Sequence, residues 1–115
     1  MDVTGPNYLP LTETTFFILL SLAPGSKHGY GIIKEVESLS DGRVTFSTGT
    51  LYGALKRLLE CGWIVGVGNP EPDESVRPRK DYRLTETGWH VLSAETDRLH
   101  KLAKLAQLWL EEGEA

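Results

Sequence analysis

The residues best suited to bind an anion lie close together, in the stretch STGTLYGALKRLLECGWI at positions 47–64. The stretch opens with small hydroxyl side chains and glycines, and two adjacent cations, Lys56 and Arg57, follow further along. Hydroxyl groups and free backbone N–H groups at the start of a helix bind phosphate oxygens and base edges, and bulky side chains there would prevent close approach. The pattern therefore indicates an anion-binding surface at this point of the chain.

The same stretch has the periodicity of an amphipathic helix. Ser47 is a good N-cap residue, and Gly62 stands where a left-handed C-terminal stop is expected. Apolar residues recur at intervals of three and four positions, so they form one buried stripe. The opposite face carries Gly49, Gly53, Lys56, Arg57 and Glu60, with Thr50 and Tyr52 on its flanks.

Three uses would explain small residues at the start of this helix. A phosphate-binding turn of the type GxxxxGK(S/T) is absent, and no strand leads into the helix within a parallel βαβ unit. Close packing of two helices needs glycines on the buried stripe, whereas Gly49 and Gly53 lie on the other face. Insertion into a DNA major groove fits the small residues and the cations together. From these residues alone one alternative stays open, in which Thr48 and Thr50 only cap the helix and the cations are solvated.

The elements around this helix predict a mostly α fold with a small β-hairpin wing, a winged helix-turn-helix followed by a long C-terminal helix. Thr12 and Thr85 are the expected N-caps of the first and the last helix. The expected order is helix 12–22, helix 28–40, a very short extended piece 44–46, helix 47–61, strand 63–67, strand 80–84 and helix 85–112.

A second group of cations lies where the wing would flank a groove. Arg77 and Arg79 end the proline-rich segment NPEPDESVRPR at 69–79, which is the expected tip of the hairpin, and Lys80 follows it. This group favours DNA binding over the alternative in which the hydroxyls only cap a helix.

Three motifs, HGYGIIKEVE, STGTLYGALKRLLECGWI and RPRKDYRLTETG, make residues 11 to about 90 resemble the PadR family of bacterial transcriptional regulators. The resemblance implies a homodimer that represses transcription by binding a pseudo-palindromic operator in double-stranded DNA. Tyr30, from the first motif, is then either a phosphate contact or a packing residue. The residues that the pattern and the resemblance assign to DNA binding are Tyr30, Ser47, Thr48, Gly49, Thr50, Tyr52, Lys56, Arg57, Arg77, Arg79 and Lys80.

The pattern and the resemblance together predict three parts: an N-terminal arm at 1–10, a winged helix-turn-helix domain at 11–84 and a dimerisation helix at 85–115. The last helix has more apolar residues than its own chain can cover, and those expected to meet a second copy are Leu99, Leu102, Ala106 and Trp109. In some relatives the C-terminal helices of the dimer enclose a pocket for flat ligands. The resemblance therefore lets Trp109 bind a small aromatic effector, and the alternative is that Trp109 is a packed dimer contact.

Composition limits the other functions. The chain has 115 residues, a hydrophobic content of 40% and a formal net charge of −4, as expected for one soluble domain. No apolar run is long enough for a membrane span, and the single cysteine, Cys61, together with the lack of a signal peptide predicts a cytoplasmic protein.

The residue types needed for catalysis or metal binding are not arranged for either. His28, His90 and His100 do not have the spacing of metal ligands, and no catalytic triad or carboxylate pair stands out. We therefore expect no metal, no cofactor and no enzyme activity. Because the net charge is negative, a winged-helix protein–protein interaction module without an operator is the second hypothesis.

Overall fold

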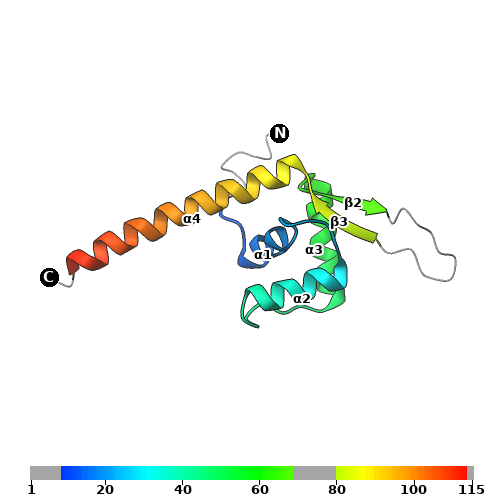
Figure 1. Cartoon of the computed structure of the whole chain (residues 1–115), viewed down its shortest axis with the longest axis horizontal. Helices are drawn as coiled ribbons and strands as arrows, with labels where there is room; N and C mark the ends of the chain where they lie inside the picture. Colours follow the sequence, from blue (N-terminus) through cyan, green and yellow to red (C-terminus); the bar gives the residue numbers. More distant parts are fainter. Residues whose placement is uncertain (1–8, 69–79, 114–115) are drawn as a thin grey trace.

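The computed structural model describes residues 9–68 and 80–113, and this part of the chain forms four helices and a small antiparallel sheet that lies at one side of them (Figure 1). In chain order the elements are α1 (Glu13–Ser21), β1 (Lys27–His28), α2 (Gly29–Leu39), α3 (Thr48–Cys61), β2 (Ile64–Gly68), β3 (Lys80–Leu84) and α4 (Glu86–Gly113). Helices α1, α2 and α3 with strands β2 and β3 form a winged helix-turn-helix, and α4 leads away from it, as the sequence predicts.

Helices α1, α3 and α4 begin after the residues that the sequence marks as N-caps, and α3 ends at the glycine that it marks as a stop. The Thr12 hydroxyl accepts a hydrogen bond from the Thr15 N–H at 3.1 Å before α1, and the Thr85 hydroxyl accepts one from the Gly88 N–H at 3.0 Å before α4. These bonds satisfy N–H groups that the first helical turn leaves without an intrahelical partner. Gly62 ends α3 with a φ of 75°, in the left-handed region that glycine adopts without a steric penalty.

The sheet has the order β1–β3–β2, and β3 is antiparallel to both neighbours. Strand β1 was not expected from the sequence. It consists of Lys27 and His28, which lie opposite Tyr82 and Asp81 of β3. A pairing this short depends on contacts between distant parts of the chain, so no local periodicity indicates it.

The expectation of a short strand at 44–46 is wrong, since these residues belong to no strand. The Val44 N–H donates a hydrogen bond to the Ser40 hydroxyl at 2.9 Å rather than to a neighbouring strand. The chain between α2 and α3 is therefore held by a side chain at the end of α2.

The core lies where the three short helices meet the base of the sheet, and the apolar stripe of each helix faces it. On α3 the buried residues are Leu51, Ala54, Leu55 and Leu58, the stripe that the sequence predicts. Helix α4 approaches this core closely at Gly88, where a Cβ atom would stand 1.9 Å from the Trp63 carbonyl oxygen. A glycine is therefore required at that crossing.

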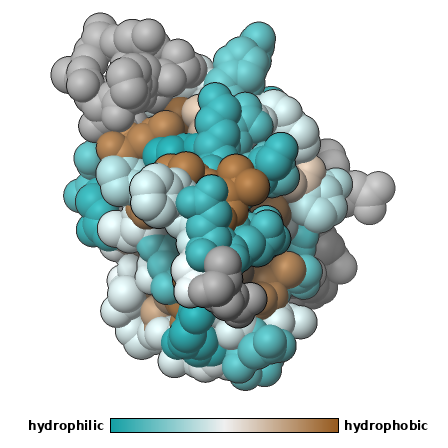
Figure 2. All heavy atoms as spheres, turned by 90° about the vertical axis from the view of Figure 1, so that its left-hand side faces the viewer, coloured by the Kyte–Doolittle hydropathy of each residue, from teal (hydrophilic) through white to brown (hydrophobic). Residues whose placement is uncertain are grey.

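Helix α4 packs on the core only with its N-terminal part. Val91, Leu92 and Glu95 are buried, whereas all residues from 99 to 113 are exposed. The helix extends past the body of the molecule, and the Cα trace measures 68 × 35 × 22 Å (Figure 1). Figure 2 views the molecule from the side toward which α4 projects, and hydrophobic residues are visible there among hydrophilic ones. No helix in the described residues combines the length and the apolar character that a membrane crossing requires.

Candidate nucleic-acid interface

The outer face of α3 is exposed along its whole length, on the side opposite the buried stripe. A Cβ atom at Gly49 or Gly53 would meet nothing of the described chain within 4 Å, so these glycines leave open space rather than room for a packed neighbour. The residues that the sequence predicts on this face are all exposed: Ser47, Thr48, Gly49, Thr50, Tyr52, Lys56 and Arg57. Their role in binding DNA stays a prediction.

The first turn of α3 presents N–H groups in front of the helix. The Ser47 hydroxyl accepts a hydrogen bond from the Thr50 N–H at 3.2 Å, and the two hydroxyl oxygens are 3.1 Å apart. The first intrahelical bond runs from the Leu51 N–H to the Ser47 carbonyl at 3.0 Å. The N–H groups of Thr48 and Gly49 precede that bond, at the positive end of the helix dipole. An anionic oxygen placed before this turn would meet them.

Tyr52 joins the outer face of α3 to the start of α2. A Cβ atom at Gly29 would stand 2.8 Å from the Tyr52 hydroxyl oxygen, so the ring lies against the backbone of α2. Tyr52 is nevertheless 49% exposed. Burial raises the pKa of the Tyr82 phenol above its ordinary value, and the nearby Tyr52 phenol adds to that shift. Tyr52 therefore packs against α2 while about half of its surface stays exposed.

Tyr30, at the start of α2, is 63% exposed. Its ring stacks on His28 with 6.4 Å between centroids, and the Lys34 Nζ atom lies 5.6 Å from the Tyr30 ring centroid. Sequence reasoning missed Lys34 as a cation beside the predicted surface. The spacing of four residues between Tyr30 and Lys34 on one helix is the signal that could have found it.

At the base of the wing, the Lys80 side chain lies across the sheet. A Cβ atom at Gly66 would stand 2.7 Å from the Lys80 Cε atom, and the Lys80 Nζ atom is 6.0 Å from the Tyr82 ring centroid. Gly66 and Tyr82 face each other in the register of β2 and β3. The glycine therefore leaves the space that Lys80 occupies. Arg77 and Arg79, the other predicted wing residues, lie outside the described residues.

The exposed cations of this surface come from three elements: Lys34 on α2, Lys56 and Arg57 on α3, and Lys80 on β3. These cations are exposed in a chain whose formal net charge is −4. Among the described residues no group of three or more His, Cys, Asp or Glu is placed to hold a metal ion. That these cations contact a polyanion stays a prediction.

Residues 18–94 match the family model of the PadR-like transcriptional regulators, and these residues make up more than half of the chain. The chain belongs to the PadR-like family. As the sequence predicts, this is a family of transcriptional regulators and not of enzymes.

An uncharacterized 37.1 kDa protein in a transposon of Streptomyces fradiae is 33% identical to this PadR-like chain over 94 residues. The matching segment covers 82% of this chain but 24% of that protein, so the chain spans about a quarter of the length of the curated relative it matches.

Two solved structures show the shared fold. A PadR family transcription regulator from hypervirulent Clostridium difficile is 24% identical with a TM-score of 0.70, and the match covers 86% of this chain and 99% of that one. Bacillus subtilis PadR, solved in complex with operator DNA, is 23% identical with a TM-score of 0.62, and the match covers 78% of this chain and 48% of that one.

The residues predicted to join two copies of this PadR-like chain lie on the projecting part of α4. Leu99, Leu102 and Trp109 are 41%, 49% and 70% exposed, and Ala106 is exposed as well. At about 100° per residue these four residues lie within about 80° of one another around the helix axis. That sector continues the side of α4 that Gly88, Val91, Leu92 and Glu95 bury against the body.

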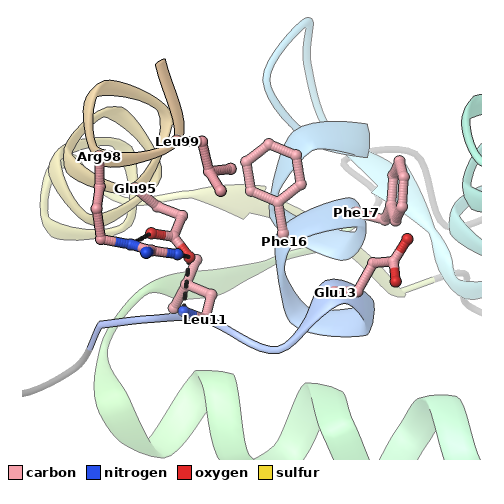
Figure 3. A pocket seen from close by; sticks show the side chains of 7 residues that line it. All are labelled: Leu11, Glu13, Phe16, Phe17, Glu95, Arg98 and Leu99. Atoms are coloured by element: carbon pink, nitrogen blue, oxygen red, sulfur yellow. Dashed lines mark hydrogen bonds and ion pairs between the residues drawn. The ribbon is translucent and has the colours of Figure 1, made fainter. Parts of the chain in front are cut away.

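A cavity of about 320 Å³ opens where α4 leaves the body. Figure 3 shows Leu99 of α4 pointing toward the Phe16 ring of α1, with Glu95 and Arg98 beside them on α4. The lining residues are Leu11, Glu13, Phe16, Phe17, Glu95, Arg98 and Leu99. The exposed sector of α4 therefore begins at an apolar hollow of its own chain.

Proposed function

We propose that this protein is a sequence-specific DNA-binding regulator that represses transcription, and that it binds a pseudo-palindromic operator as a homodimer. The observation that carries the proposal is the free outer face of α3, where first-turn hydroxyl and N–H groups are followed by Lys56 and Arg57. A reading helix enters the major groove with such an N-terminal turn. Bacillus subtilis PadR, which has the same fold, is known in complex with operator DNA, and this supports the same partner here.

In this proposal some residues contact bases and others contact phosphates. Phosphate contacts position a protein on DNA, whereas base contacts select the sequence. The first turn of α3 meets base edges and adjacent phosphates through Thr48, Gly49, Thr50 and Tyr52. The phosphate contacts are assigned to Tyr30, Ser47, Lys56, Arg57 and Lys80, with Arg77 and Arg79 from the wing. A protein with this partner acts in the cytoplasm.

The proposed dimer forms through α4. Its exposed apolar sector would otherwise stay in water, and burial of apolar surface favours association. Linking two reading helices also allows simultaneous contact with half-sites about one helical turn apart. Sedimentation of Leu102→Asp tests the dimer, since a charge in the apolar sector gives a monomer with weakened operator binding. A wild-type monomer at micromolar concentration contradicts it.

We also propose that Trp109 binds a small planar aromatic effector between the two copies of α4. Aromatic stacking adds about 0.5–1.5 kcal/mol to the free energy of area burial, which gives modest affinity. The effector releases DNA only if it prefers a dimer with wrongly spaced reading helices. Quenching of tryptophan fluorescence by planar aromatic compounds, absent in Trp109→Ala, supports this role. Quenching that persists in that variant assigns Trp109 to dimer packing alone.

Selection of bound sequences from a random pool of duplex DNA tests the main proposal. We expect enrichment of two inverted half-sites with centres about 10 base pairs apart, and an affinity that falls as salt rises. The competing hypothesis, a winged-helix protein–protein interaction module without an operator, predicts no enrichment above background. That outcome would exclude an operator.

A further inference from the structure

Glu95 is the last residue of α4 that the body of its own chain buries, and only 2% of it is exposed. Its Oε2 atom accepts a hydrogen bond from the Leu11 N–H at 2.7 Å. The Arg98 guanidinium donates to Oε1 at 2.5 Å and to Oε2 at 3.1 Å (Figure 3). Glu95 therefore ties the segment that leads into α1 to the last buried turn of α4.

Burial of a carboxylate at this position has an unfavourable free energy. The carboxylate loses hydration on burial, and an ion pair only partly restores the lost free energy, whereas an apolar side chain of similar volume would simply extend the stripe of Val91 and Leu92. The hydrogen bonds fix the orientation of α4 relative to the segment before α1, because they restrict both the distances and the angles between their partners. Apolar contacts between helices permit more sliding and repacking.

The direction of α4 at Glu95 determines where the far end of the helix lies. Trp109 lies fourteen residues beyond Glu95, and every residue of α4 from 99 to 113 is exposed. At a rise of about 1.5 Å per residue, Trp109 lies about 21 Å from Glu95 along the helix axis. A tilt of about 10° at Glu95 would displace Trp109 by almost 4 Å, which is comparable with the rise of about 3.4 Å between base pairs.

We propose that Glu95 is a positioning residue that sets the direction of α4, and thereby the separation of the two reading helices and the half-site spacing that the dimer accepts. Glu95 itself touches no DNA in this arrangement. The inference rests on the proposed function, because it requires a dimer formed through α4. It adds a determinant of operator geometry that lies outside the DNA-binding surface.

The first test compares operators that differ only in spacing. The selected half-sites are placed at the preferred separation and at one and two base pairs more or less, and binding is measured for wild type and Glu95→Gln. The wild type should discriminate by about tenfold or more, because the wrong spacing demands twisting or bending of the duplex. In Glu95→Gln this ratio should fall severalfold, while affinity for a single isolated half-site stays the same. Unchanged discrimination in Glu95→Gln would overturn the proposal.

Two further variants separate positioning from a general loss of structure. Asp97→Asn removes an exposed carboxylate on the other side of the same helix and should leave the spacing preference unchanged. Arg98→Lys keeps the charge but cannot form the forked contact with Glu95, and its side chain is 34% exposed, so the fold should tolerate it. It should shift the spacing preference in the direction of Glu95→Gln, and an unchanged preference in this variant contradicts the role of the pair.

A measurement without DNA distinguishes failure of this inference from failure of the proposed function. A spin label is attached to α3 at Glu60→Cys, in a chain that also carries Cys61→Ser. Pulsed electron paramagnetic resonance then gives the distance between the two labels of the dimer. Wild type and Asp97→Asn should show one narrow distribution, and Glu95→Gln a broader or displaced one. Identical distributions in all three overturn the inference even if the protein binds its operator. A changed distribution in Glu95→Gln supports the role of Glu95 in setting the separation of the two α3 helices, and the absence of an operator would then count against the proposed function alone.

Discussion

The hydroxyl oxygen of Tyr52 on α3 lies so close to Gly29, the first residue of α2, that a Cβ atom there would stand only 2.8 Å away. The predicted reading helix is therefore braced against the preceding helix by one of its own surface residues. Because Tyr52 keeps 49% of its surface exposed, it can move away from an added side chain without unfolding the core.

Gly29→Ala should accordingly displace Tyr52 more than it destabilises the fold. We expect operator affinity to fall, with a change in the free energy of unfolding of less than about 1 kcal/mol, since alanine also favours helix formation by up to about that amount. Urea unfolding and DNA titration measure the two effects. In the Tyr52→Phe background, which lacks the crowded oxygen, Gly29→Ala should cost less affinity, and equal losses in both backgrounds would contradict the contact.

Gly88→Ala should be among the most destabilising substitutions of a small residue in the chain. The added Cβ would stand 1.9 Å from the Trp63 carbonyl oxygen, which is backbone and cannot rotate away. Overpacking of this kind costs about 1–3 kcal/mol or more, and we expect the upper part of that range. Thermal unfolding is the measurement. Gly113→Ala is the control, since a Cβ there meets nothing within 4 Å, and similar stabilities for both variants would refute the close crossing.

Much of the fold could be predicted because its signals are local. The apolar stripe of α3 follows from residue spacing, and Ser47 and Gly62 mark the ends of that helix through their own backbone preferences. The outward position of Lys56 and Arg57 then follows from the same periodicity. Strand β1 and the hydrogen bond between Glu95 and Leu11 could not be predicted. The partners in that bond are 84 residues apart, and an acid within an apolar stripe is normally assigned to solvent.

The contact between Tyr52 and Gly29 also cannot be predicted from the sequence, because it depends on how α2 packs on α3. The sequence assigned Tyr52 to the edge of the DNA-binding face without a packing partner. Periodicity therefore located the face, whereas the bracing of its residues required tertiary structure.

Gly66→Ala should disturb the wing through Lys80. The new Cβ would stand 2.7 Å from the Lys80 Cε atom, so the lysine side chain must leave its place over the Tyr82 ring. If Lys80 contacts phosphate, operator affinity falls in Gly66→Ala and falls no further when Gly66→Ala is added to Lys80→Ala. Gly68→Ala, whose Cβ would meet nothing within 4 Å, is the matched control. If the two substitutions reduce operator affinity additively in the double variant, Gly66 does not act through Lys80.

The ion pair of Glu95 should make stability depend on acid pH. The Arg98 guanidinium holds the pKa of the Glu95 carboxyl below its ordinary value, and the Leu11 N–H acts in the same direction, while burial opposes both. A lowered pKa in the folded state contributes stability above the unfolded pKa of about 4.3, and that contribution is lost as the pH falls through the folded value.

Urea unfolding of wild type and Glu95→Gln between pH 7 and pH 3 tests this dependence. The stability difference between the two proteins should be largest near neutral pH and should shrink as the pH falls below the unfolded pKa of about 4.3 and through the lower folded pKa of the wild-type carboxyl. Asp97→Asn, which removes an exposed acid, should show a smaller change. A difference between wild type and Glu95→Gln that stays constant over the whole range would argue against the ionised pair.

The central claim, that the outer face of α3 binds DNA, is tested most directly by the salt dependence of affinity for the selected operator. Lys56 on α3 and Lys101 on α4 are both exposed lysines, so they form a matched pair. Removing one phosphate contact per half-site lowers the slope of log affinity against log salt by roughly one unit for each contact. We predict this change for Lys56→Ala and none for Lys101→Ala. Equal slopes for wild type, Lys56→Ala and Lys101→Ala would contradict the assignment of α3 as the reading helix.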